Sequence, residues 1–279
     1  MRERAVFTNR MRGATWLALG GLGAATAVAP KTVRAIVAAL TATIGIAHGA
    51  TDAATLERLG FRPRGGRAAI SIAYGIAAIG VYAAARSRPA TASRALRAVS
   101  WAHFGTGDAA FARACGSPRF EPAEAFVRGG VPLAIGGRDA RSAVATIVAA
   151  LFAGVAFADD DIPDAIDVAL PAVVLYGAPR RLGFGCYFAA WHAPRHLALL
   201  LERDPRGGTY AERFVRFARE SAPNALLASA FGAVAYVLGR GRAPDEDLVA
   251  SLILAITIPH QLAVWGIEYL ARGEAARTF

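Results

Sequence analysis

The sequence predicts an all-α integral membrane protein, a polytopic bundle of about eight transmembrane helices around a buried histidine cluster. Of its 279 residues, 55% are hydrophobic and 19% are charged, whereas soluble domains carry about 25% charged residues. Charge-poor apolar runs recur at lengths near the ~20 residues that a helix needs to cross ~30 Å of hydrocarbon. These runs are rich in Ala, Leu, Val and Ile and lack the period-2 alternation of strands.

The candidate membrane segments follow one another along almost the whole chain. They are Ala14–Pro30, Val33–Ala54, Ala68–Ala85, Leu96–Ala114, Ala123–Ile135, Ser142–Ala158, Ile162–Ala178, Leu182–Leu201, Asn224–Leu238 and Leu248–Leu270. Some are too short or too polar to cross alone, so we expect about one or two half-buried segments besides the crossings. No soluble domain or fixed repeat separates them, and residues 1–279 are predicted to form a single multi-pass domain in the cell membrane.

The topology of this bundle stays open. An arginine-rich start favours a cytoplasmic N-terminus, and the acidic run Asp159–Asp161 favours an external loop. Simple alternation of the runs places both on one side, so either a segment is re-entrant or the first helix does not span. Residues 1–30 also resemble a signal peptide, and of the two alternatives we favour an uncleaved first helix over a cleaved leader.

The longest polar stretch between apolar runs is Glu202–Ala222. In it, Tyr210, Phe214 and Phe217 fall at i, i+4 and i+7 and would share one face of a helix. A helix lying in the membrane interface and a solvated connector both fit this pattern.

The formal net charge of +10 does not come from one basic patch. The basic residues lie singly or in pairs between the apolar runs, a placement typical of contacts with anionic lipid headgroups. We therefore expect membrane lipids as partners and no nucleic acid.

The five histidines all lie inside, or at the end of, candidate membrane segments. They are His48 in GIAHGATD, His103 in SWAHFGTGD, His192 and His196 in AAWHAPRH, and His260 in TIPHQ. Ionisable side chains at membrane depth are costly and normally face a cavity or a partner. One such histidine is usually a packing residue, but five of them with none in a polar loop indicate a functional site.

His192 and His196 are four residues apart and would project from one face of a helix. This spacing is the usual helical way to offer two imidazoles to one metal ion. Pro194 lies between them and would kink the helix there, which could aim both rings at one point. A structural role for the pair fits the spacing equally well.

Two carboxylates accompany the first two histidine motifs. Asp52 lies four residues after His48, and Asp108 lies five residues after His103. A buried carboxylate can accept the second N–H of a ligand histidine and fix its tautomer. We expect this supporting role for both, although residues at helix ends facing headgroup water would also explain them.

A site built from imidazoles suits zinc, copper or iron better than calcium or magnesium, which prefer oxygen ligands. Inside a lipid-embedded bundle the natural substrate is apolar. The chemistry therefore favours a non-haem Fe(2+) centre with open positions for dioxygen.

The motifs GIAHGATD, SWAHFGTGD, WHAPRH and IPH, in this order, resemble the Brp/Blh family of membrane-bound β-carotene dioxygenases. Each motif alone is weak, but the combination is specific. The resemblance covers residues 44–270, which would form the catalytic bundle, and leaves an N-terminal helix in residues 1–40 outside it. Members of the family supply retinal to rhodopsins, so the resemblance also implies a functional link to a retinal-binding rhodopsin.

The resemblance implies which residues would act. The family's proposed iron ligands match His48, His103, His192 and His196 here, which would make these four both metal ligands and catalytic residues. His260 matches the family's Pro-His motif and is expected to line the pocket or serve as a reserve ligand.

The implied reaction is oxidative cleavage of the central double bond of β-carotene by O₂, giving two all-trans-retinal. The carotenoid would enter from the lipid phase. Trp191 and Phe104, with Phe188 and Trp101, are candidate walls of a substrate tunnel, and each of them also fits an ordinary packing role.

Two other functions use the same histidines. A membrane haem cytochrome would need ligands on opposite faces of one iron, which a pair four residues apart on one helix does not supply. A metal transporter usually adds carboxylates or thiolates along a path, for which Asp52 and Asp108 are the main candidates. A retinal-binding opsin is disfavoured because Lys31, at the edge of the first helix, is the only lysine available for a Schiff base.

Overall fold

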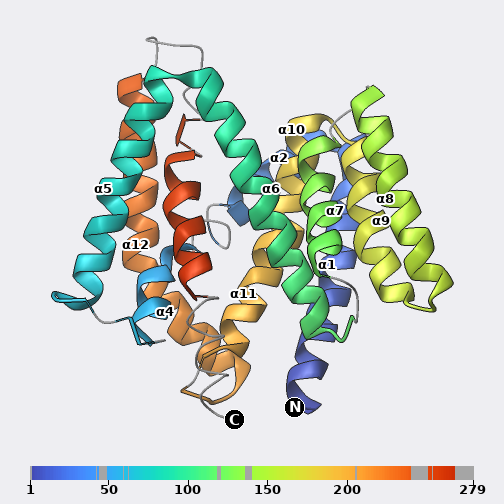
Figure 1. The fold of residues 1–279 in the computed structure, drawn as a ribbon, viewed down its shortest axis with the longest axis horizontal. Coiled ribbons are helices and arrows are strands. Elements are labelled where there is room, and N and C mark those ends of the chain that lie inside the picture. Colours follow the sequence, from blue (N-terminus) through green and yellow to red (C-terminus); the bar gives the residue numbers. More distant parts are fainter. Residues whose placement is uncertain are drawn as a thin grey trace. The chain divides into compact units, whose positions relative to one another are not determined.

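The computed structural model describes the residues in the ranges 2–41, 43, 49–58, 60–61, 63–117, 121–135, 140–204, 206–239, 251–252 and 254–267. Most of these residues are helical, and no strand occurs among them (Figure 1), so the all-α prediction is confirmed. The chain divides into two compact units, each assembled from two separate stretches of sequence. Unit 1 comprises Met1–Gly45 and Ser100–Asp204, and unit 2 comprises Ile46–Val99 and Pro205–Phe279.

Unit 1 holds most of the labelled helices. They are α1 (Arg2–Val28), α2 (Pro30–Leu40), the second half of α6 (Pro89–Ala114), α7 (Glu121–Ala134), α8 (Ala140–Ala158), α9 (Ile162–Gly177), α10 (Arg180–Tyr187), a π-helical turn (Phe188–His192) and α11 (Ala193–Glu202). In Figure 1, α8 and α9 run side by side, and α1 packs against both α9 and α11. The apolar core of this unit draws Leu19 from α1, Val37 from α2, Leu175 from α9 and Trp191 from the π turn.

Unit 2 contains α4 (Asp52–Arg58), α5 (Gly66–Ser87), the start of α6, α12 (Tyr210–Gly239) and an unlabelled helix, Leu254–Ile267. Leu56, Ala263 and Ile267 form a small apolar core, against which Ile70 packs. The amide of Asn224 donates a hydrogen bond of 2.9 Å to the carbonyl of Ala50, which ties α12 to the chain just before α4.

Prolines and a turn set several helix boundaries. Pro30 begins α2, because a proline has no N–H to donate and its fixed φ suits the first helical turn. In the run Val33–Ala54, which was expected to form one segment, α2 ends at Leu40, residues 49–50 are helical, and Thr51 is a turn residue just before α4. Residues 42 and 44–48 lie outside the described ranges, so the continuity of this segment stays a prediction.

Helix α12 begins inside the polar stretch Glu202–Ala222, at Tyr210. Thr209 and Glu212 cap this helix reciprocally: the Thr209 N–H donates to the Glu212 carboxylate at 2.8 Å, and the Glu212 N–H donates to the Thr209 hydroxyl at 3.3 Å. The hydrogen bond from the Thr209 backbone N–H to the Glu212 carboxylate, together with one from the Thr209 side chain, lowers the pKa of Glu212.

One described helix, Gly66–Ser87, is long and apolar enough to cross a membrane. Two shorter apolar helices, Ser142–Ala158 and Leu254–Ile267, fall below that length. About eight crossings therefore stay a prediction.

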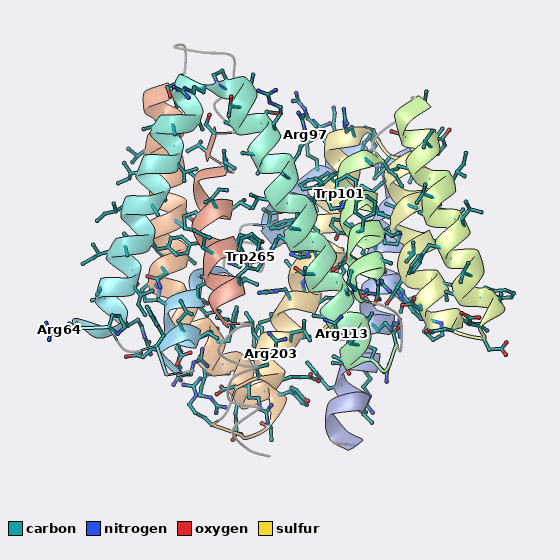
Figure 2. All side chains as sticks on the ribbon, viewed as in Figure 1. Arg64, Arg97, Trp101, Arg113, Arg203 and Trp265 are labelled. Carbon is teal, nitrogen blue, oxygen red and sulfur yellow. The ribbon has the colours of Figure 1, made fainter. Side chains whose placement is uncertain are left out.

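Helices α6 and α7 pack with their backbones almost in contact. A Cβ added at Gly105 would collide with the carbonyl of Ala125, and one added at Gly129 would collide with the carbonyl of Trp101. Trp101, labelled on α6 in Figure 2, donates its indole N–H to the carbonyl of Phe126 at 2.9 Å. Small residues at such a seam are typical of helix pairs that pack in lipid, and this seam fixes the segment that carries His103.

Candidate metal centre

The segment that carries His192 and His196 is a helix with one widened turn. Pro194 has no N–H for an α-helical hydrogen bond to the residue four positions earlier. The chain accommodates this through the π turn Phe188–His192, in which the Ala193 N–H bonds the carbonyl of Phe188, five residues back. Single π turns are frequent at functional sites. Here the turn ends at His192.

His103 and His192 meet in the interior of unit 1. Their Nε2 atoms lie 3.1 Å apart, and their rings are 3% and 1% exposed. His196 lies next to both: its ring centre is 6.0 Å from that of His103 and 6.1 Å from that of His192, with which it is stacked. Three of the four predicted ligands are thus neighbours in space, although His103 and His192 are 89 positions apart in the sequence.

Asp108 lies beside this group and faces His192. Its Oδ1 is 3.5 Å from His192 Nδ1, while its Oδ2 accepts hydrogen bonds from the Tyr187 hydroxyl at 2.7 Å and from the Trp191 indole N–H at 3.1 Å. A carboxylate on Nδ1 favours the tautomer in which Nε2 carries the lone pair. That lone pair is on the side of the ring that faces His103.

The spacing of the two Nε2 atoms can be compared with a metal centre. Metal–imidazole bonds of about 2.0–2.1 Å, the length found for zinc, separate neighbouring ligand nitrogens by about 2.8–3.4 Å at octahedral to tetrahedral angles. The observed 3.1 Å falls in that interval, so His103 and His192 fit two adjacent positions on one ion. Over the described ranges, however, no group of three His, Cys, Asp or Glu side chains is arranged to hold a metal.

The aromatic candidates pack around these rings. Phe104 is 4% exposed and lies edge-on to His192 with ring centres 4.6 Å apart, and it also contacts Tyr187. Trp191 is fully buried, and Phe188 stacks on His192 with ring centres 6.2 Å apart. These side chains fix the imidazole of His192 from several sides.

The remaining candidates belong to unit 2. His260 Nδ1 lies 2.7 Å from the carboxylate of Asp52, and both side chains are buried. The His260 ring rests on Gly49, where an added Cβ would come within 3.1 Å of Nδ1. His48 lies outside the described residues, so its expected pairing with Asp52 stays a prediction.

Two charged residues and a tyrosine near the histidines are not among the residues that the sequence singled out. Arg195 lies inside the WHAPRH motif, Asp167 lies in the apolar run Ile162–Ala178, and Tyr187 donates to Asp108. Arg195 and Asp167 are both buried. The reasoning that singled out the histidines, that ionisable groups in apolar runs need a partner, would have found both charges had it been extended to Arg and Asp.

Comparison with known families completes this description. A family model described as beta-carotene 15,15'-dioxygenase matches residues 37–153 and residues 137–266. The two matched segments overlap and together span most of the chain, including all five histidines. Comparisons with curated proteins and with solved structures returned no match.

Proposed function

This chain belongs to the β-carotene 15,15'-dioxygenase family, and from that premise we propose that it cleaves the central double bond of β-carotene with O₂ to give two molecules of all-trans-retinal. The observation that carries the proposal is the buried imidazole pair of His103 and His192, whose Nε2 atoms lie 3.1 Å apart. This pair belongs to two of the motifs on which the resemblance rests.

We infer that Fe(2+) is held by His103 and His192, with His196 and His48 completing the set. The donor chemistry supports iron over calcium or magnesium, because the candidate ligands are neutral nitrogens. When bound, such an iron supplies a site at which dioxygen and the double bond can meet. His196 is proposed because its ring centre lies 6.0 Å from that of His103 and 6.1 Å from that of His192, and His48 enters the proposal from the family motif.

The surrounding side chains would prepare this reaction. Asp108 holds the proton on His192 Nδ1 and leaves Nε2 free to bind. Phe104 and Trp191 exclude water from the imidazoles, since they are 4% and 0% exposed. A dry, apolar setting suits a hydrocarbon substrate that arrives from lipid.

Multi-pass insertion in the cell membrane belongs to the same proposal. Large apolar side chains are exposed on helices of both units, including Ile76 (66%) on α5 and Leu151 (66%) on α8. Broad exposed apolar surface normally marks a partner or a membrane. A retinal-binding rhodopsin would be the acceptor of the product.

The test is co-expression with a β-carotene pathway in a bacterium that lacks retinal. We expect loss of the orange colour and the appearance of retinal by chromatography. His192→Ala should keep the cells orange. Lys31→Ala, which removes the only lysine, an exposed one, should behave as wild type and shows that no retinal Schiff base is involved. If cells that carry the wild-type chain correctly inserted in the membrane keep their β-carotene, the proposal is refuted.

A further inference from the structure

Six charged side chains that the proposed chemistry does not use form one buried network in unit 1. They are Arg12 of α1, Glu124 and Arg128 of α7, Asp164 and Asp167 of α9, and Arg195 of α11. None is more than 4% exposed. The three arginines balance the three carboxylates, which is how buried charge is tolerated in an apolar interior.

Asp167 is the centre of this network. Its Oδ2 accepts from Arg12 Nε at 2.9 Å and lies 2.7 Å from Arg12 Nη2. Its Oδ1 accepts from Arg195 Nη2 at 2.7 Å and from the Trp16 indole N–H at 2.7 Å. Asp164, one turn earlier, instead contacts Arg128 and lies 3.6 Å from Arg12.

Arg195 carries the network to the histidine site. Its Nε donates to the hydroxyl of Thr15 at 3.0 Å, and its guanidinium carbon lies 3.4 Å from the centre of the Trp191 ring. Trp191 in turn donates to Asp108, which faces His192. An unbroken series of contacts therefore runs from α1 and α9 to the imidazole of His192.

We propose that Asp167 is a positioning residue: together with Thr15 and Trp16 of α1, it holds Arg195 flat against Trp191 and so fixes Asp108 and His192. The guanidinium is over-determined, because hydrogen bonds from two of its nitrogens and the stacked indole define one orientation. A buried ion pair adds little net stability over apolar packing. We therefore take the contribution of the Asp167–Arg195 pair to be the orientation of the Arg195 guanidinium on Trp191. The proposal rests on the proposed function only for the identity of the bound metal.

This assignment gives α1 a role in supporting the site, although α1 lies outside the residues that the family model matches. The family match begins at residue 37, whereas Arg12, Thr15 and Trp16 fall at i, i+3 and i+4 on α1 and meet the network from one face. The support of the site is therefore partly supplied from outside the family region.

The experiment compares Asp167→Asn with Asp164→Asn in the full-length protein in detergent. Both changes remove one buried carboxylate from the same network and are expected to lower the unfolding temperature of the metal-free protein. Only Asp167 contacts Arg195 and Trp16. We therefore expect Asp167→Asn to weaken Fe(2+) binding about 10–100-fold, the usual effect of losing an outer partner of a ligand, and Asp164→Asn to leave it near wild type.

A second measurement follows the indole N–H resonance of Trp191 by NMR of metal-free protein. Asp167→Asn should shift it and Asp164→Asn should not. Thr15→Val, which removes no charge and keeps the shape, should cause a smaller shift of the same resonance and is the variant to use if Asp167→Asn does not fold. Arg195→Lys, which keeps the charge but loses the planar stacking, should resemble Asp167→Asn.

Equal effects of Asp167→Asn and Asp164→Asn on both metal affinity and the Trp191 resonance would overturn the positioning role. If the wild-type chain binds no iron, the proposed function fails on its own. The Trp191 resonance then still decides the present proposal, because it is measured without metal.

Discussion

Asp108 is held by two donors and presents its other oxygen to His192. The hydrogen bonds from Tyr187 and Trp191 both end on Oδ2 and hold that oxygen in place, while Oδ1 lies 3.5 Å from Nδ1 of the imidazole. Carboxylates that bind the outer nitrogen of a ligand histidine raise its basicity as well as setting its orientation. The charge of Asp108, and not only its shape, should therefore control metal binding.

Asp108→Asn should weaken iron affinity about 10–100-fold and leave the protein folded in the membrane. The amide preserves the size of the side chain but removes the charge. Titration of metal-free protein in detergent measures the change. Tyr187→Phe is the matched control, since it removes one hydrogen bond to the same oxygen and keeps the charge, and its effect should be smaller. Unchanged affinity in Asp108→Asn would remove this residue from the site.

Asp52 and His260 form a second carboxylate–imidazole pair, in unit 2. At 2.7 Å and buried, they should act as one unit. A double-mutant cycle with Asp52→Asn and His260→Ala, measured by unfolding in detergent, should give a coupling of about 0.5–3 kcal/mol. Additive effects of the two changes would show that the pair does not interact in the folded protein.

The same variants address whether His260 binds metal. We expect His260→Ala to keep most of its iron, because four imidazoles leave an iron centre only about one or two open positions and a fifth would compete with dioxygen. Iron content by elemental analysis decides this. A loss as complete as that of His48→Ala would make His260 a ligand.

At the scale of elements, the seam between α6 and α7 sets the position of His103. Gly105 follows His103 by two residues and touches the backbone of α7, and Gly129 touches the backbone of α6. In lipid, where helix association depends on close packing, such contacts require glycine. A methyl group here would separate the helices and move His103 away from His192.

Gly129→Ala should destabilise the protein by about 1–3 kcal/mol, the usual cost of overpacking. Gly154→Ala is the matched control, since Gly154 lies on α8 with no atom within 4 Å of an added Cβ. Alanine there should be neutral or stabilising by about 0.4–1 kcal/mol. Unfolding temperatures in detergent measure both. Effects of the same sign would contradict this account of the seam.

The sequence predicted the helical elements better than their contacts. Composition and periodicity identified an all-α chain, and the i, i+4 spacing correctly placed His192 and His196 side by side. The partners of Asp52 and Asp108 could not be found in this way, because spacing reports only on neighbours within one helix. In the structure, each carboxylate faces an imidazole on another helix, His260 or His192. The approach of His103 to His192 likewise depends on packing between helices.

At the scale of the whole molecule, several charged side chains are buried while large apolar side chains are exposed. Arg12, Arg128 and Arg195 are buried in unit 1, while Ile72 on α5 and Leu226 on α12 are 62% and 71% exposed. Water would penalise the exposed side chains, and lipid would not. Among the described helices, Gly66–Ser87 alone is long and apolar enough to cross a membrane, so this arrangement is not visible from the helices taken one at a time.

We therefore expect the protein to stay in the membrane pellet after an alkaline carbonate wash and after high salt. A protein held only by arginine contacts with anionic headgroups would be released by salt, since screening removes that attraction. Immunoblotting of pellet and supernatant measures the distribution. Recovery in the salt supernatant would contradict multi-pass insertion.

The links between α1 and the rest of unit 1 also govern how the chain can be assembled. The hydrogen bond from Arg12 to Asp167 joins residues 155 positions apart, and that from Arg195 to Thr15 joins residues 180 apart. While the nascent chain leaves the ribosome, Arg12 lacks its Asp167 partner until α9 has been synthesised, and a buried arginine without its carboxylate is costly. Helix α1 can therefore be locked in place only after α9 and α11 have been made, and a chain interrupted before α11 cannot yet hold its histidines for a metal.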